Sequence, residues 1–503
     1  MLFNSLPFLF VFLPITFIGF FALGALSTRL AGAWLAAASL FFYGWWNVEF
    51  VSLLLASVAF NYGSGYLIGQ ARDKTTQGKL KALLTVAVGG NLLLLSYYKY
   101  VDFFGASVAG LFGLPSPFDA IILPLGISFF TFTQIAFLVD TYKGKASEYD
   151  IVHYLLFVTY FPHLIAGPIL HHKQMMPQFS EASTYRINSS NISIGLTIFA
   201  IGLIKKVLIA DRLALIATPI FSTTMTGDEP ALVEAWMGTL AYTLQLYFDF
   251  SGYCDMAIGL SLMFNVKLPL NFNSPYKATN IIDFWRRWHM TLSTFLRDYL
   301  YIPLGGNQKG NRRRYINLFL TMLLGGLWHG AAWTFVVWGA LHGFYLIVNH
   351  GFRALCQQRG WSGARYPRLT TAAAGVLTFV CVMIGWVVFR AETFQSAQVM
   401  LSGMFGGAGV AHHGVFEVSD IHDSELVPIA LALLVVLILP NTQEFMRDFN
   451  PLQEPVEAPA GRIRALRWSP RRLKTWMPIA FFFALALMSM SPHRVSEFLY
   501  FQF

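Results

Sequence analysis

Two histidines could take part in proton transfer, one inside an apolar run and one in a basic, tryptophan-rich segment. His329 stands inside a strongly apolar run of membrane length and follows Gly325 and Gly326. An ionisable residue in such a run is costly, so it marks a functional site by default. His289 lies in the basic, tryptophan-rich sequence FWRRWH at 284–289. Because a neutral imidazole is the usual general base near neutral pH, both histidines are candidates for acid–base catalysis.

The two glycines before His329 allow two interpretations. On a helix, Gly325 and Gly326 would share the face of His329. Their missing side chains could leave a groove through which a thin substrate reaches the imidazole, or they could let a second helix pack closely. His342 follows 13 residues after His329, on another face of such a helix, which indicates a separate structural role.

The composition places these histidines in a helical membrane protein. The chain has 503 residues, of which 55% are hydrophobic and 12% are charged, and its mean hydropathy is +0.54. Apolar runs recur from end to end, and they predict an all-α polytopic protein with roughly 11 to 13 transmembrane or re-entrant segments in one domain, 1–503. The net charge of +9 comes from basic residues in short loops between these runs. That distribution is typical of cytoplasmic loops and argues against nucleic-acid binding.

The signs of the connecting segments predict the topology around His329. Segments 286–314 and 353–368 are basic, whereas 404–425 is acidic. Because basic loops stay in the cytoplasm, the first two lie on the same side of the membrane. The stretch 315–349 must therefore enter and return as a hairpin, with His329 near its turn.

The segment around His289 predicts one amphipathic helix at the cytoplasmic membrane surface. Arg286 and Arg297 would return to nearly the same face of this helix, and Asp283 could pair with Arg287 four residues later. His289 would face inward on the tryptophan flank. The three arginines could anchor anionic lipid headgroups or bind the phosphates of a cytoplasmic cofactor.

Four further charged residues lie in apolar surroundings. Lys205 and Lys206 are expected to extend to the membrane surface. Asp249 and Asp255 are six residues apart and so lie on different faces of a helix, which argues against a catalytic pair. Each aspartate is expected to be satisfied by a polar residue one turn earlier.

Motifs for metals and nucleotides are missing from the sequence. Cys254, Cys356 and Cys381 match no metal or disulfide spacing. No Walker-type loop, GxSxG elbow or HExxH pair occurs. We therefore expect neither a primary pump nor a soluble hydrolase, and no bound metal.

Several long motifs resemble the membrane-bound O-acyltransferases, above all the bacterial branch that contains the membrane subunit of alginate O-acetylation. The resemblance covers nearly the whole chain. The motifs are PHLIAGP at 162–168, QLYFDFSGYCDMAIGL at 245–260, DFWRRWHMTLSTFLRDYLYIPLGGN at 283–307, LWHGAAWTFVVWGALHG at 327–343 and WVVFRAETFQSA at 386–397.

This resemblance implies a fold, a reaction and a set of partners. The histidine of the LWHG motif, His329, would be catalytic, and that of the WRRWH motif, His289, would be the second important position. The fold would be a helical ring with a thinned centre and a tunnel from the cytoplasm to His329. An acyl group, acetyl from acetyl-CoA, would enter from the cytoplasm of a bacterium through its inner membrane. A periplasmic acetyltransferase partner would complete transfer to a polysaccharide such as alginate or cellulose.

The chemistry expected of His329 is that of a general base. A hydroxyl must lose its proton as it attacks a thioester carbonyl, and a neutral imidazole can accept that proton. An acyl-histidine intermediate is a second possibility. We expect His289 to assist donor binding or proton handling.

Two alternative functions stay open at the level of the sequence. One is D-alanyl transfer in teichoic-acid assembly, by relatives that share the WRRWH and LWHG motifs and take the acyl group from a carrier protein. The other is a polysaccharide or lipid transporter in which His329 and the aspartates relay protons. The sequences LPLGISFFTF at 123–132 and LYIPLGGN at 300–307 favour acetyl transfer.

Overall fold

The structure is a computed structural model, and every regular element in the residues that it describes is a helix. The residues that it describes are 1–72, 74, 76–116, 118, 121–146, 150–360, 367–410, 426–454, 467–470, 472–490 and 496–499. The acidic residues between 417 and 425, on which part of the topology prediction rests, lie outside these ranges.

Five helical stretches in the described part of the chain are long and apolar enough to cross a membrane. They are α3 (Glu49–Ala71), α4 (Gln77–Leu111), the continuous stretch Ser189–Thr226, α14 (Trp333–Gln358) and Arg368–Arg390 within α15. Three shorter apolar helices cover Phe8–Gly24, Leu426–Ile438 and Leu473–Ser489. The predicted all-α class is therefore confirmed, whereas the ring, the thinned centre and the tunnel stay predictions.

The chain divides into two compact units. The first comprises Met1–Leu203, Tyr253–Leu270 and Met446–Gln502, and the second comprises chiefly Ile204–Gly252 and Asn271–Phe445. One boundary falls inside α10 (Leu232–Met263). A single domain over 1–503 stays a prediction.

The first unit is held together partly by buried amides between apolar helices. The side chains of Asn61 on α3 and Asn91 on α4 bond each other reciprocally, at 2.9 and 2.6 Å. Gln134 donates to the Ser57 hydroxyl at 2.9 Å. Such pairs satisfy polar groups where no water is available. The other helices of this unit are α1 (Leu13–Gly24), α2 (Thr28–Gly44), α5 (Ile127–Tyr142), α6 (Ile151–Thr159), α7 (His172–Ser180), α8 (Ser189–Ile204, but for its last residue) and α19 (Leu473–Ser489).

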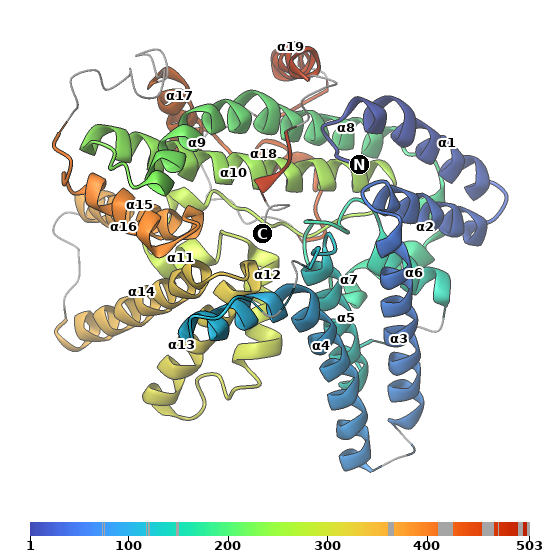
Figure 1. The fold of residues 1–503 in the computed structure, drawn as a ribbon. Helices are drawn as coiled ribbons and strands as arrows, with labels where there is room; N and C mark the ends of the chain where they lie inside the picture. The colour runs from blue at the N-terminus through green and yellow to red at the C-terminus, as the bar shows by residue number, and fades with distance from the viewer. Residues whose placement is uncertain are drawn as a thin grey trace. The chain divides into compact units, whose positions relative to one another are not determined.

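The second unit contains the segments that hold both candidate histidines. Helices α13 (Gly310–His329) and α14 run side by side as a hairpin (Figure 1). The hairpin predicted for 315–349 is thus confirmed. The unit also contains α9 (Asp211–Thr226), the first part of α10, α11 (Ile281–Trp285), α12 (Met290–Leu296), α15 (Pro367–Arg390), α16 (Phe394–Met404), α17 (Leu426–Ile438) and α18 (Thr442–Phe445).

Glycines allow α13 and α14 to touch along their backbones. A Cβ added to Gly326 would lie 2.9 Å from the Cα of Gly339 and would overlap the carbonyl oxygen of Phe335. At Gly325, an added Cβ would lie 3.1 Å from a methyl carbon of Leu296. Gly326 therefore serves close packing of the two helices, which is one of the two roles that the sequence allowed for this glycine pair.

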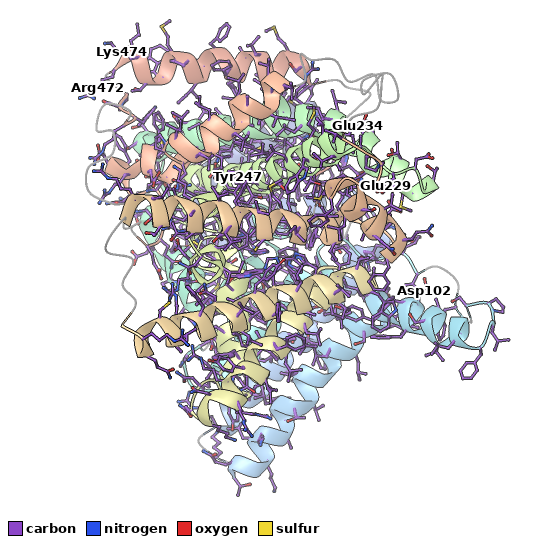
Figure 2. The ribbon with its side chains drawn as sticks, turned by 90° about the vertical axis from the view of Figure 1, so that its left-hand side faces the viewer. Asp102, Glu229, Glu234, Tyr247, Arg472 and Lys474 are labelled. Carbon is purple, nitrogen blue, oxygen red and sulfur yellow. The ribbon has the colours of Figure 1, made fainter. Side chains whose placement is uncertain are left out.

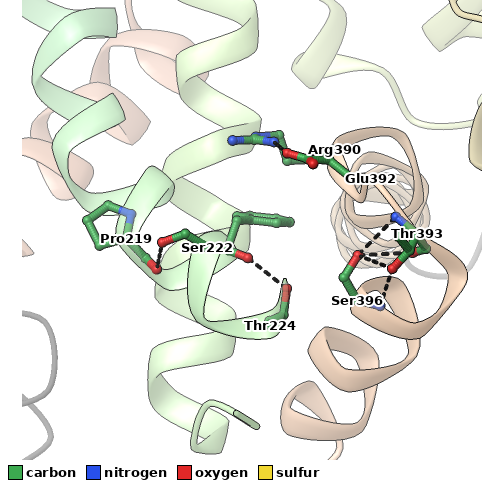
Figure 3. Close-up of polar contacts among 8 residues, drawn as sticks. Pro219, Ser222, Thr224, Arg390, Glu392, Thr393 and Ser396 are labelled. Carbon is green, nitrogen blue, oxygen red and sulfur yellow. Dashed lines mark hydrogen bonds and ion pairs between the residues drawn. The ribbon is translucent and has the colours of Figure 1, made fainter. Parts of the chain in front are cut away.

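Polar contacts fix the end of α15, which carries Phe389, one of the rings of the site described below. The Arg390 guanidinium lies 5.7 Å from the ring centroid of Phe221 on α9 and 3.9 Å from the Glu392 carboxylate. Thr393 and Ser396 form a capping box that begins α16 (Figure 3). These contacts hold the turn between α15 and α16 in one conformation.

The start of α10 is capped by an acidic residue. The Glu234 carboxylate accepts a hydrogen bond from the backbone N–H of Ala231 at 3.1 Å. Figure 2 shows Glu229 and Glu234 near this end of the helix and Tyr247 further along it. Negative charge at a helix N-terminus stabilises the first turn.

Candidate active site

His329 lies at the turn of the hairpin. It is the last residue of α13, Gly330 continues in an extended conformation, and α14 begins at Trp333. The His329 side chain is buried, with 4% of the residue exposed. Because Gly326 presses α13 against α14 one turn earlier, the position of His329 is fixed by backbone packing.

Aromatic rings meet the His329 imidazole edge-on. The ring centroids of Trp328, Trp338 and Phe389 lie 5.0, 5.2 and 5.4 Å from that of His329. They come from α13, α14 and α15. A wall of apolar rings excludes water, which strengthens hydrogen bonds and charge interactions at the imidazole.

His289 lies beside His329 in the same unit. The two ring centroids are 6.3 Å apart, and the centroid of Phe250 on α10 is 4.9 Å from that of His289. The structure therefore brings both predicted histidines together. The backbone of His289 is left-handed, with a φ of +44°, which is uncommon for a residue with a Cβ. Such conformations cost free energy and cluster at functional sites.

The predicted amphipathic helix around His289 is wrong. Helix α11 ends at Trp285, α12 starts at Met290, and the left-handed residue His289 interrupts the segment between them. A π-helix then covers Arg297–Tyr301. The common face expected for Arg286 and Arg297 depended on one continuous helix, so that prediction fails as well.

The three arginines of this segment are each at least partly exposed. Arg287 bonds the Asp283 carboxylate at 2.9 Å, which confirms the predicted pair. Arg297 bonds Asp298 at 2.6 Å, and Arg286 is exposed. Binding of cofactor phosphates by these arginines stays a prediction.

Burial keeps the His289 imidazole neutral. It lowers the pKa of His289 from 6.5 to about 3, because the imidazolium would be poorly solvated in this interior. The neutral ring has a free lone pair near pH 7, although a pKa so far below the working pH makes it a weak base.

Sequence reasoning missed two neighbours of this histidine pair. The Asn271 side-chain oxygen lies 3.2 Å from the Nδ1 atom of His289, although 18 residues of chain separate them. No local spacing could have revealed this contact. Phe389, by contrast, lies in the sequence WVVFRAETFQSA that contributed to the family resemblance, so a signal for it existed.

His342 is closer to the site than its sequence position indicated. The argument from helical phase does not apply, because α13 ends at His329 and His342 belongs to α14. Trp285 donates its indole N–H to Nδ1 of His342 at 3.2 Å. The Trp338 ring contacts both histidines, with centroids 4.9 Å from His342 and 5.2 Å from His329.

The expected roles of Lys206 and Asp249 are also wrong. Lys206 is buried and forms ion pairs with Asp211 and Asp249, each at 2.8 Å. The stretch Lys205–Ala210 is a π-helix, in which residues five apart share a face, so Lys206 can reach Asp211. Lys206 therefore does not extend to the membrane surface, and Asp249 is paired with a residue of another segment.

Replacing Lys206 by Met should destabilise the protein strongly. The change leaves the buried Asp249 without this cation, and breaking a buried ion pair costs about 3–5 kcal/mol. We expect a lower midpoint of thermal unfolding in detergent, largely restored in Lys206→Met/Asp249→Leu. The remaining partner, Asp211, is partly exposed and can be solvated.

Lys205→Met is the matched control for this prediction. The Lys205 ammonium lies 6.0 Å from the ring centroid of Tyr247, a contact that contributes about 1 kcal/mol or less when exposed. Equal effects of the two lysine substitutions would contradict the importance of the buried pairs.

The arrangement suits acid–base chemistry carried out by protein side chains. Two buried imidazoles lie side by side, one of them held neutral by burial. In the described ranges, no group of three or more His, Cys, Asp or Glu side chains is placed to hold a metal ion. What this site can supply is removal of a proton from a hydroxyl and its return to a leaving group.

Comparison with known proteins identifies the class to which this fold and site belong. Residues 40–389 match the membrane-bound O-acyltransferase family. The chain belongs to this family, and it is a multi-pass membrane protein and an O-acyltransferase.

Individual relatives fall into three groups with different named activities. The chain is 44% identical to the peptidoglycan O-acetyltransferase of Helicobacter pylori, over 82% of this chain and 81% of that protein. It is 40% identical to the probable alginate O-acetylase of Pseudomonas putida over the full length of both. It is 30% identical to the teichoic acid D-alanyltransferase of Bacillus subtilis, over 54% of this chain and 69% of that protein.

Proposed function

We propose that this protein moves an acetyl group from cytoplasmic acetyl-CoA across the bacterial inner membrane for O-acetylation of a polysaccharide outside. The observation that carries the proposal is the meeting of His289 and His329 beside a wall of aromatic rings. The identities of about 40% to O-acetyltransferases, some over the full length, support the choice of acetyl. A periplasmic acetyltransferase would receive the group or complete its transfer.

His329 would act as the general base of this reaction. It takes the proton of the acceptor hydroxyl while the oxygen attacks the thioester carbon. The carbon–sulfur bond then breaks, and the coenzyme A thiolate takes up the proton. The products are an acetyl ester and free coenzyme A, so atoms and charges balance.

The named activities of the relatives support more than one acceptor glycan. Alginate and cellulose were the acceptors expected from the sequence, and the Helicobacter pylori relative adds peptidoglycan. All three are extracytoplasmic glycans with free hydroxyls, which is the shared chemistry of the proposal. D-alanyl transfer is the second candidate, because the Bacillus subtilis relative shares half of the chain.

The donor and acceptor can be tested together in membrane vesicles that contain the protein. Radiolabelled acetyl-CoA is offered with alginate oligosaccharides in one arm and peptidoglycan fragments in another, each with and without a periplasmic fraction. A third arm offers radiolabelled D-alanyl carrier protein. We expect label from acetyl-CoA in one glycan and none from the carrier protein.

Two outcomes would contradict the proposal. Transfer from the carrier protein, with none from acetyl-CoA, would establish the D-alanyl alternative. Transport of an unmodified glycan without acyl transfer from either donor would point to a transporter and would contradict the activity assigned through the family.

A further inference from the structure

Backbone hydrogen bonds join the loop at Asn271 to the segment that carries His289. The backbone N–H of Met290 donates to the Asn271 carbonyl at 3.0 Å, and that of Asn273 donates to the Arg287 carbonyl at 2.9 Å. Both segments belong to the second unit. The pairing places the Asn271 side chain, which is fully buried, against the His289 ring.

The orientation of the Asn271 amide follows from a donor whose role is fixed. The backbone N–H of Thr291 faces the Asn271 Oδ1 atom at 3.2 Å, and the Thr291 hydroxyl donates to the same atom at 2.8 Å. A backbone N–H can only donate, so the amide atom that faces it must be the oxygen. Rotating the amide would place its NH₂ group against this N–H and lose the bond from the backbone.

The same oxygen determines which nitrogen of His289 carries the proton. Oδ1 lies 3.2 Å from Nδ1 of His289, and an amide oxygen can only accept. A hydrogen bond between them therefore requires a proton on Nδ1. A neutral imidazole has one N–H, so the basic lone pair then resides on Nε2.

We propose that Asn271 is a positioning residue that holds His289 as the Nδ1–H tautomer, with Nε2 as the basic nitrogen in acyl transfer. This inference rests on the proposed role of His289 in the reaction. Two further features restrain the ring. The left-handed backbone sets the direction of the side chain, and the Phe250 ring packs edge-on at 4.9 Å.

Two titratable groups on other elements bear on a change in pH dependence, one in contact with the His289 ring and one next to Phe250, which packs on that ring. His329 on α13 contacts its ring directly. On α10, Asp249 precedes Phe250 and is paired with Lys206. The pH dependence of the Asn271 variants must therefore be measured in proteins that retain His329 and Asp249.

Two substitutions of Asn271 separate the tautomer from packing. Asn271→Leu removes the acceptor and should lower kcat by about 10- to 100-fold, the loss typical when a metal-bound histidine loses the partner that orients it. Asn271→Asp keeps an acceptor and should retain most activity. Its carboxylate favours the imidazolium and raises the pKa of His289, so the acid-side limb that His289 contributes, which lies below pH 5 in the wild type, should move to higher pH.

Asn91→Leu and Asn91→Asp provide the matched control. Asn91 is a buried, hydrogen-bonded asparagine in the first unit, and the same substitutions there should lower thermal stability without moving the acid-side limb. A purely structural role for Asn271 predicts that its two variants behave like those of Asn91, and this result would overturn the proposal.

The tautomer can also be measured without activity. Protein with ¹⁵N-labelled histidine gives separate NMR shifts for protonated and unprotonated ring nitrogens, and comparison with His289→Gly assigns the signals. We expect a protonated Nδ1 and an unprotonated Nε2, with this pattern lost in Asn271→Leu. A protonated Nε2 in the wild-type protein would overturn the proposed tautomer, even if His289 is essential. If the wild-type protein shows the expected tautomer but His289→Gly is active, only the role of His289 in the reaction is overturned.

Discussion

Replacing His329 by alanine is expected to lower the rate of acyl transfer by about 10²- to 10⁴-fold, the range that general acid–base catalysis contributes. The acceptor hydroxyl would have to lose its proton to water, which the rings of Trp328, Trp338 and Phe389 exclude from this position. The measurement is kcat and KM with radiolabelled acetyl-CoA on purified protein. The loss should appear mainly in kcat, because a base acts in the transition state.

A second substitution and a distant histidine make this result interpretable. His329→Ala leaves a void among aromatic rings, so His329→Gln, which fills more of the space but is not a base, should be equally inactive while it unfolds near the wild-type temperature. His153→Ala, at a partly exposed histidine on α6, should keep its activity. Substantial activity in His329→Gln would refute the role of general base.

Replacing His289 should also reduce kcat, by about 10- to 10²-fold, at the lower end of what acid–base groups contribute. The contact between the two imidazole rings indicates proton handling beside His329, so KM should change less than kcat. Because burial lowers the pKa of His289 to about 3, its ring stays neutral above about pH 4. Its own titration should therefore add no limb to the wild-type pH–rate profile between pH 5 and 8.

The glycine variant separates the imidazole from the backbone at this position. The φ of +44° suits glycine, so His289→Gly relieves backbone strain that His289→Ala retains. Both variants should be inactive, and the glycine variant should lose less stability. Wild-type kcat and KM in both would show that His289 is dispensable, and a rise in KM alone would assign it to donor binding.

The sequence was sufficient to predict the helical class and the hairpin at His329, for identifiable physical reasons. Apolar runs of membrane length dominate the chain, and two basic segments on the same side require the stretch between them to return. Gly326 could be predicted as a possible packing residue because the sequence alone shows where a Cβ is missing. Its partner, Gly339, becomes evident only once the two helices face each other.

The contacts that complete the site could not be read from local pattern. His289 was expected on a continuous helix, because periodicity alone does not reveal a left-handed residue whose conformation is held by a distant loop. Lys206 was expected at the membrane surface for a similar reason. One partner, Asp211, is reached across a π-helical turn, and the other, Asp249, lies 43 residues further along the chain. Neither spacing is one that brings side chains together on an ordinary α-helix.

The pairing of Lys206 with Asp211 has a consequence for how the protein is made. Ser189–Thr226 is synthesised before Asp249, which lies 43 residues after Lys206, an interval of seconds at ribosomal rates of about 5–20 residues per second. A lysine near the centre of an inserting helix costs about 2.5–3.5 kcal/mol at the translocon. Asp211 emerges with the same segment, so we expect the nascent helix to carry its own counter-ion into the bilayer before Asp249 has been translated.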